Sequence, residues 1–240
     1  MKTIGLIGGM SWESTAVYYR RLNEQVRDLC GGLHSAEIVM RSVDFESIVA
    51  MQTSGHWDDA TNVLRRIASE LEGAGADCVL ICTNTMHKLA DAVQAEIRIP
   101  VLNIIDICAH KLKAAGVRRP LLLATRYTME QDFYRERMNR QHGLDTIVPE
   151  ADDRTAVHDI IFSELCRGII RETSRQRYMN VIARGRAAGA DSVILGCTEI
   201  GLLIQPKNVD LPTFDSTLLH ADAAVDFALG DGPLGRADAA

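Results

Sequence analysis

Two segments of this chain repeat one another, and each runs from an apolar stretch into a row of small polar residues. The first is Gly75–His87 (GADCVLICTNTMH), and the second is Gly189–Gly201 (GADSVILGCTEIG). Aligned without a gap, they place Thr83 opposite Cys197. Each copy is typical of a short buried strand that opens into a polar loop. The repeat therefore predicts two related halves whose loops can face one another across a groove.

Cys197 is the strongest candidate for chemistry in the second copy. It follows Gly196, which lets backbone approach closely, and it precedes Thr198 and Glu199 at the expected start of a helix. The positive end of a helix dipole can lower the pKa of a cysteine, and the thiolate would then serve as a base. A groove flanked by two acid–base groups suits the transfer of a proton from one face of a carbon atom to the other. The competing interpretation of Cys197 is a buried structural cysteine.

Thr83 occupies the matching position in the first copy, but its hydroxyl is a poor general base because it does not titrate near neutral pH. It could relay a proton through a neighbour, or it could only hydrogen-bond a ligand. Asn84, Thr85 and Thr198 offer short polar side chains and amides that suit a carboxylate, and helix capping is their alternative role. Glu199 could orient the base, or it could be a solvated carboxylate.

Composition narrows the range of functions. The chain has 240 residues, of which 47% are hydrophobic and 24% are charged, and its formal net charge is -6. Basic residues form no stripe for nucleic acid, and no apolar stretch approaches the roughly 18 residues of a membrane span. We therefore expect no nucleic-acid or membrane partner and predict a cytoplasmic location. The six cysteines include no C-x-x-C pair, and Walker and dinucleotide-binding glycine motifs are absent, so we expect neither a metal nor a nucleotide.

The alternation of apolar runs and helical patterns predicts an α/β fold with parallel sheets flanked by helices. The expected strands are Thr3–Ile7, Ala36–Val43, Cys78–Ile81, Val101–Ile104, Leu121–Ala124, Thr146–Val148, Ser192–Leu195 and Pro212–Phe214. The expected helices are Glu13–Cys30, Asp58–Gly73, His87–Glu96, Asp106–Ala115, Glu130–Arg140, Val157–Glu172 and Ser174–Ala188. We place the first domain at 1–99 plus a returning strand and helix at 211–230, the second at 100–210, and a frayed tail at 231–240.

Four motifs, spread over nearly the whole chain, resemble one known family. They are GLIGGMSWEST, CTNTMHK, TRYTMEQDFY and GCTEIGLL. The chain resembles the aspartate/glutamate racemases that use no pyridoxal phosphate. This resemblance implies two pseudo-symmetric α/β domains with the active site in the cleft between them, no cofactor, and a homodimer. In that family a cysteine from each domain flanks the substrate, so that one thiolate removes the α-proton and the other thiol returns a proton to the opposite face.

The resemblance carries a catalytic cysteine onto Cys197 and puts Thr83 where family members commonly have the first cysteine, in agreement with the gapless repeat. It also implies that further residues bind the amino-acid substrate, namely Met10, Gln52, Asn84, Thr85, Thr125, Thr128 and Thr198. We add Glu199 to this predicted substrate-binding set. Aspartate racemases of the family hold the distal carboxylate of the substrate with basic residues. No motif of this chain matches those residues, and Arg41 and Arg167 are the candidates.

The predicted function is a cofactor-independent amino-acid racemase that interconverts L- and D-aspartate or glutamate by proton transfer at Cα between Cys197 and Thr83. One alternative is a related racemase or decarboxylase that acts on another small carboxylate or on a hydantoin. The other alternative is a non-catalytic amino-acid-binding protein. Exchange of the α-proton with solvent separates the enzymes from a pure binding protein.

Overall fold

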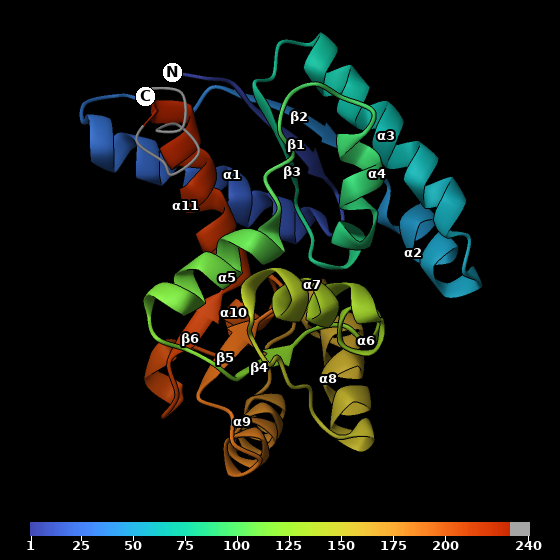
Figure 1. Cartoon of the computed structure of the whole chain (residues 1–240), viewed down its shortest axis with the longest axis vertical. Helices are drawn as coiled ribbons and strands as arrows, with labels where there is room; N and C mark the ends of the chain where they lie inside the picture. The colour runs from blue at the N-terminus through green and yellow to red at the C-terminus, as the bar shows by residue number, and fades with distance from the viewer. Residues whose placement is uncertain (231–240) are drawn as a thin grey trace. The chain divides into compact units, whose positions relative to one another are not determined.

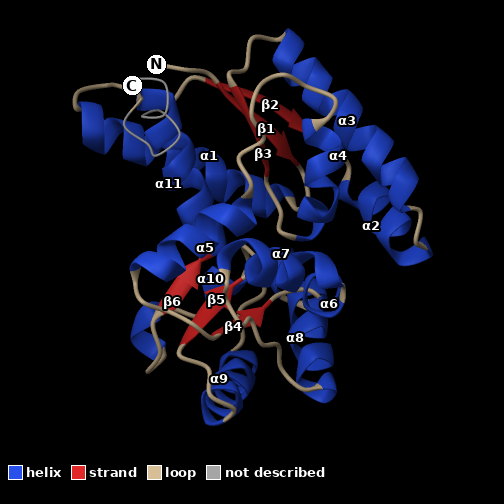
Figure 2. Cartoon of the chain, viewed as in Figure 1, coloured by secondary structure: helices blue, strands red, loops and turns tan. Residues whose placement is uncertain are grey.

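The computed structural model describes residues 1–230, and the expected frayed tail at 231–240 lies outside the described residues. The chain divides into two compact units (Figure 1). The first holds residues 1–103 together with the segment from His220 onward, and the second holds Ile104–Leu219. Within residues 1–230, each unit contains a three-stranded parallel sheet with helices around it, as Figure 2 shows by colour. The α/β class with parallel sheets is confirmed.

The sheet of the first unit has the strand order β2-β1-β3. Its strands are β1 (Ile4–Gly8), β2 (Ile38–Ser42) and β3 (Cys78–Ile81). Every residue of β1 and β3 is buried, because helices cover both faces, whereas β2 is an edge strand with exposed residues. The helical segments are α1 (Trp12–Cys30), α2 (Phe45–Ser54), α3 (Trp57–Gly73), η1 (Thr85–Leu89), α4 (Ala90–Gln94) and the part of α11 (Ser216–Leu229) that starts at His220.

The sheet of the second unit has the strand order β4-β5-β6. Its strands are β4 (Pro120–Leu123), β5 (Ser192–Leu195) and β6 (Thr213–Asp215). The helical segments are α5 (Ile104–Ala114), α6 (Arg126–Glu130), α7 (Asp132–His142), α8 (Ala151–Ser163), η2 (Leu165–Arg167), α9 (Glu172–Ala187), α10 (Ile200–Leu203) and η3 (Pro206–Asn208). The core of this unit packs the fully buried residues of β4 and β5 against these helices.

The domain boundary differs from the predicted one at its C-terminal side. Residues 211–219 were expected in the first domain, but β6 pairs in parallel with β5 of the second unit. The amide of Val193 donates a hydrogen bond to the carbonyl of Pro212 at 2.9 Å, which ties this segment to the second sheet. The chain therefore returns to the first unit only within α11, at His220.

Several predicted elements were wrong. The expected strands at Val101–Ile104 and Thr146–Val148 are reduced to isolated bridges at Val101 and Ile147. The helix expected at Val157–Glu172 instead spans Ala151–Ser163. Two acidic residues in its first turn favour that earlier start, and the backbone leaves helical geometry at its C-cap, where ψ is -65° and φ is -123°. Helix α2 was not predicted.

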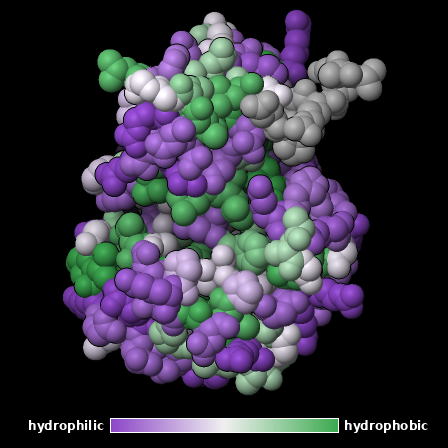
Figure 3. All heavy atoms as spheres, turned by 90° about the vertical axis from the view of Figure 1, so that its left-hand side faces the viewer, coloured by the Kyte–Doolittle hydropathy of each residue, from purple (hydrophilic) through white to green (hydrophobic). Residues whose placement is uncertain are grey.

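On the face shown in Figure 3, hydrophilic side chains surround separate patches of apolar side chains. The exposed large hydrophobic side chains are Met1, Trp12, Tyr19, Leu29, Leu33, Met40, Ile169, Ile170 and Leu202. Among residues 1–230, no helix has both the length and the apolar composition that a membrane span requires.

Candidate active site

In the first unit, two loops leave the same edge of the sheet. β1 and β3 are paired in parallel, so the residues that follow each strand lie side by side. Ser14, in the first turn of α1, donates a hydrogen bond from Oγ to the carbonyl of Cys82 at 3.2 Å and joins the two loops. The structure thus brings together the loop that holds Met10 and the loop that holds Thr83.

The loop after β1 is fixed by glycine and by helix capping. Gly9 has a φ of +88°, and a Cβ there would collide with the backbone of Val43. Its amide donates to Thr15 Oγ1 at 2.8 Å. The Oγ of Ser11 accepts the amide of Ser14 at 3.2 Å and so caps α1. These bonds hold the intervening Met10 in a buried position, with 4% of its surface exposed.

The side chain of Gln52, which belongs to α2, contacts the segment that follows β3 and Thr83. Its side chain is buried, and its Nε2 donates to the sulfur of Met86 at 3.1 Å. Met86 belongs to η1, which starts at Thr85 directly after Asn84. Asn84 and Thr85 are both buried, and Asn84 occupies the N-cap position of η1 without a capping hydrogen bond from its side chain. Gln52, Asn84 and Thr85 therefore belong to one packed segment.

Thr83 differs from its neighbours because its side chain is partly exposed. Its amide donates to the carbonyl of Ile81 at 2.8 Å, and its carbonyl accepts from His87 Nδ1 at 2.8 Å. Within residues 1–230 its hydroxyl makes no hydrogen bond, so no side chain there is placed to deprotonate it. The preceding Cys82 is fully buried, and this burial raises the pKa of its thiol.

A buried histidine, His220, packs against His87, whose ring contacts the Thr83 carbonyl. His220 Nε2 lies 2.7 Å from the carbonyl of Leu102, which can only accept, so Nε2 carries the proton. The Tyr18 hydroxyl therefore donates to His220 Nδ1, at 2.8 Å. Burial lowers the pKa of His220 to about 3, and neighbouring His87 adds to this effect, so His220 is neutral near pH 7. The His87 and His220 rings lie 5.5 Å apart in an edge-to-face arrangement.

The second unit repeats this design at the carboxyl ends of β4 and β5. The two strands are paired in parallel, and the amide of Gly196 donates to the carbonyl of Leu123 at 2.7 Å. Thr125 and Thr128 follow β4, and their hydroxyl oxygens are 3.3 Å apart. Both are buried. Cys197 follows β5, so the structure places it at the same sheet edge as the two threonines.

The thiol of Cys197 is engaged by a carboxylate. Its Sγ donates a hydrogen bond to Glu199 Oε2 at 2.9 Å. Burial, followed by the negative charge of Glu199, raises the pKa of Cys197 well above its ordinary value. The predicted lowering of this pKa was wrong. The helix that follows, α10, has only four residues and therefore a weak dipole, whereas the carboxylate is in direct contact. At rest, Cys197 is a thiol.

Glu199 and Thr198 lie inside the second unit rather than on its surface. Glu199 is only 4% exposed, which overturns its interpretation as a solvated carboxylate. Thr198 Oγ1 accepts a hydrogen bond from Thr217 Oγ1 at 3.2 Å. Thr217 follows β6 as Cys197 follows β5, and the sequence analysis missed it. No apolar run marked this position, because β6 reads Thr-Phe-Asp and is only partly buried.

Neither candidate arginine joins these groups. Arg41 lies within β2, is exposed, and pairs with Glu70 at 3.4 Å. Arg167 is exposed at the end of η2. Within residues 1–230, no hydrogen bond or ion pair connects either arginine with a predicted site residue. In the same residues, no group of three or more His, Cys, Asp or Glu side chains is suited to hold a metal ion.

Solved structures resemble this chain closely. A protein from Yersinia pestis, provisionally described as an Asp/Glu racemase, is 50% identical, with a TM-score of 0.89 over 95% of this chain and 100% of that chain. PH1733 of Pyrococcus horikoshii OT3, an aspartate racemase homologue, is 33% identical, with a TM-score of 0.84 over the same shares of the two chains. The similarity therefore covers both units.

A named relative and a family model agree with this similarity. The broad specificity amino-acid racemase RacX of Bacillus subtilis is 20% identical over 231 residues, which are 92% of this chain and 96% of that protein. The model of the Asp/Glu/hydantoin racemase family matches residues 7–224, a range that includes all the candidate site residues. Membership of this family supports an isomerase of the racemase type. This chain belongs to the Asp/Glu/hydantoin racemase family.

Proposed function

We propose that this protein is a cofactor-independent racemase that interconverts the L and D forms of aspartate or glutamate. The observation that carries the proposal is the hydrogen bond from Cys197 Sγ to Glu199 Oε2, at 2.9 Å, directly after strand β5. A thiol beside a buried carboxylate can either give up a proton to the substrate or pass its proton to the carboxylate. Both events are needed in racemisation.

In the proposed reaction, Cys197 and Thr83 act on opposite faces of the substrate α-carbon. The thiol proton moves to Glu199 along the existing hydrogen bond, and the sulfur then takes the α-proton. The electron pair of the broken C–H bond remains on the substrate as a carbanion, delocalised into its carboxylate. A proton arrives at the other face through the Thr83 hydroxyl, which regains its own proton from water.

Stabilisation of that carbanion requires hydrogen-bond donors around the substrate α-carboxylate. We propose that two groups of buried polar residues supply them. In the first unit these are Asn84 and Thr85, and in the second they are Thr125, Thr128 and Thr198. Their burial strengthens each bond to the carboxylate because water competes less. Met10 and Gln52 complete the proposed substrate-binding set.

Exchange of the α-proton with solvent tests the proposal. The protein is dialysed against EDTA, kept free of pyridoxal phosphate, and incubated in deuterated buffer with a panel of L- and D-amino acids. NMR is expected to show α-deuterium in aspartate or glutamate, and chiral chromatography is expected to show the opposite enantiomer. Binding without exchange would identify a non-catalytic binding protein, release of carbon dioxide would identify a decarboxylase, and activity restored by added metal would refute cofactor independence.

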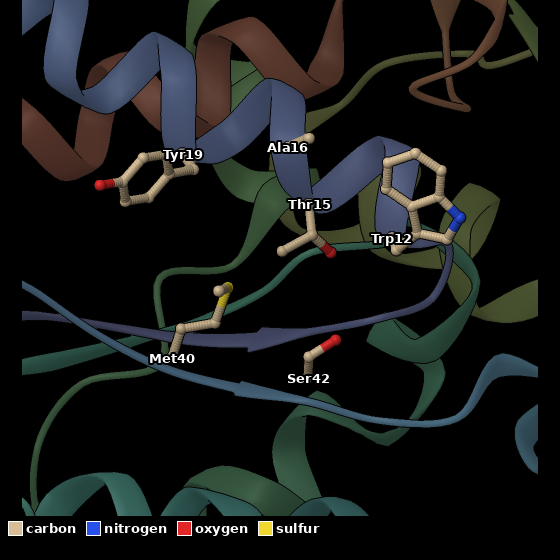
Figure 4. A pocket seen from close by; sticks show the side chains of 6 residues that line it. All are labelled: Trp12, Thr15, Ala16, Tyr19, Met40 and Ser42. Atoms are coloured by element: carbon tan, nitrogen blue, oxygen red, sulfur yellow. The ribbon is translucent and has the colours of Figure 1, made fainter. Parts of the chain in front are cut away.

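We also propose that the enzyme forms a homodimer, which acts on a small metabolite in the cytoplasm. An apolar hollow between α1 and the edge strand β2 supports self-association (Figure 4). Trp12 and Tyr19 of α1 and Met40 of β2 line it, and they remain 68%, 54% and 46% exposed. Exposed apolar side chains that adjoin one another are a feature of interaction surfaces. The proposed cytoplasmic location is a separate point, and cell fractionation tests it.

The combined substitution Tyr19→Glu and Met40→Glu is expected to convert the dimer into a monomer, because two charges would then be buried at the contact. Sedimentation velocity measures the change. Leu33→Glu is the matched control, since Leu33 is fully exposed but does not line the hollow, and it is expected to remain dimeric. A monomeric wild-type protein, or a dimer that persists in the double variant, would contradict the proposed interface.

A further inference from the structure

Three side chains of α8 form a row on one face of the helix. Arg154, His158 and Phe162 are spaced four residues apart, so they lie one above the other. The row contacts α6, the short helix that starts directly after Thr125 and contains Thr128. A helix of five residues is not stable by itself, so its conformation depends on such contacts.

His158 holds the beginning of α6. Its Nδ1 accepts a hydrogen bond from the backbone amide of Arg126 at 3.2 Å. The imidazole lies edge-to-face with the Tyr127 ring, with the centroids 5.8 Å apart. The Phe162 ring is also close, with its centroid 4.7 Å from that of the imidazole and its plane tilted. The ring is thus fixed in place with its acceptor nitrogen directed at the amide that follows Thr125.

Arg154 holds the other end of the same helix. Its Nε donates to Glu130 Oε1 at 3.0 Å, and a second guanidinium nitrogen donates to the carbonyl of Pro149 at 2.8 Å. Between these two anchors, the amides of Thr128 and Met129 both donate to the Thr125 carbonyl at 3.0 Å. The turn that presents the two threonines is therefore held by α8 at both ends.

We propose that His158 is a positioning residue for the substrate-binding turn Thr125–Thr128. Its neutral imidazole fixes the Arg126 amide and thereby the spacing of the two threonine hydroxyls that meet the substrate carboxylate. This assignment rests on the proposed function for its effect on substrate binding, but the contact with the Arg126 amide stands independently of it. If the turn loosens, Thr125 and Thr128 would bind the substrate carboxylate less tightly. Cys197 and Glu199, which follow β5, would still transfer protons as before.

The contact requires an unprotonated Nδ1, and its surroundings favour that state. Burial lowers the pKa of His158 most, and the positive charge of Arg126 adds to this effect. The negative charges of Asp159 and Glu130 oppose it, although Glu130 is paired with Arg154. His158 therefore stays neutral at pH 7 and gains its proton only below its ordinary range. Protonation places two donors face to face, so the turn loosens as the pH falls.

Two substitutions of His158 distinguish the role of its hydrogen-bond acceptor, Nδ1, from the role of its aromatic ring. His158→Phe keeps an aromatic side chain but has no acceptor, whereas His158→Asn keeps an acceptor near the position of Nδ1 and does not titrate. His110→Asn is the matched control, because His110 is an exposed histidine of another helix of the same unit. The measurements are the hydrogen exchange of the Arg126 amide, corrected for its intrinsic rate, and kcat and KM between pH 5 and pH 8.

In His158→Phe, we expect the Arg126 amide to exchange about three- to tenfold faster and KM to rise by a similar factor, as loss of one hydrogen bond predicts. We expect kcat to change less than KM. In wild type, the corrected exchange rate of the Arg126 amide and KM should both rise as the pH falls. His158→Asn should abolish this rise, and its Arg126 amide should remain protected from exchange at neutral pH. His110→Asn should behave as wild type.

The outcomes distinguish failure of the positioning role from failure of the proposed function. Unchanged exchange of Arg126 in His158→Phe would overturn the positioning role, whatever the activity. Faster exchange with an unchanged KM would overturn the link to substrate binding. Faster exchange in a protein that has no racemase activity would support the contact between His158 and the turn and refute the proposed function instead.

Discussion

Replacement of Cys197 by serine is expected to lower kcat by at least about a hundredfold, in line with general acid–base contributions of about 10²–10⁴. A serine hydroxyl can still donate to Glu199, so the fold and the hydrogen bond should persist. It cannot accept the α-proton in the same way, because an alkoxide forms far less readily than a thiolate. Turnover of each enantiomer, measured by chiral chromatography, tests this expectation. A folded Cys197→Ser protein with near-normal turnover would rule out Cys197 as a proton-transfer group.

Substitution of Glu199 tests whether this carboxylate and Cys197 act together in proton transfer. If Glu199 takes the thiol proton, then Glu199→Gln should lower kcat as well, and the double variant should lose little more than Cys197→Ser alone. Such non-additivity is expected when two groups act as one proton-transfer pair. Cys30→Ser is the control, because Cys30 is an exposed cysteine at the C-terminal end of α1. Additive losses would mean that Glu199 contributes independently of the thiol.

The repeated segments allowed one buried strand of each sheet to be predicted closely. β3 and β5 span Cys78–Ile81 and Ser192–Leu195, the bounds expected from the sequence. Their apolar character results from burial on both faces, which leaves a strong local signal. The weaker bridges at Val101 and Ile147 were mistaken for strands because apolar runs of three or four residues do not reveal how far pairing extends.

The chemical state of the site depends on contacts that sequence patterns do not show. The pKa of Cys197 is raised because the chain turns after β5 and brings the Glu199 carboxylate back to the sulfur. The pairing of Tyr18 with His220 joins distant parts of the chain. The acceptor role of His158 depends on how α8 packs on α6. The last two contacts are set by tertiary packing, so no local pattern predicted them, whereas the sequence offered Glu199 as a partner of Cys197 without showing its effect on the thiol pKa.

Thr83 makes the proposed reaction unequal on its two faces. Cys197 has a carboxylate that can take its proton, whereas the Thr83 hydroxyl has no hydrogen bond within residues 1–230. We therefore expect one enantiomer to exchange its α-proton with solvent much faster than the other at saturating concentration. Thr83→Cys should raise the slow exchange by about tenfold or more, because a thiol is a far better acid and base near neutral pH than a hydroxyl.

Thermodynamics limits what this substitution can change. The free L and D forms have equal energy in water, so kcat/KM must be the same in both directions for wild type and for every variant. The asymmetry can appear only in the separate values of kcat and KM and in the rates of solvent exchange. Thr83→Ser is the matched control, since it keeps a hydroxyl at the same position and should leave the slow exchange slow. Deuterium uptake is measured for each enantiomer separately. Equal uptake in wild type, together with no gain in Thr83→Cys, would show that Thr83 is not the second proton-transfer position and serves at most to bind the substrate.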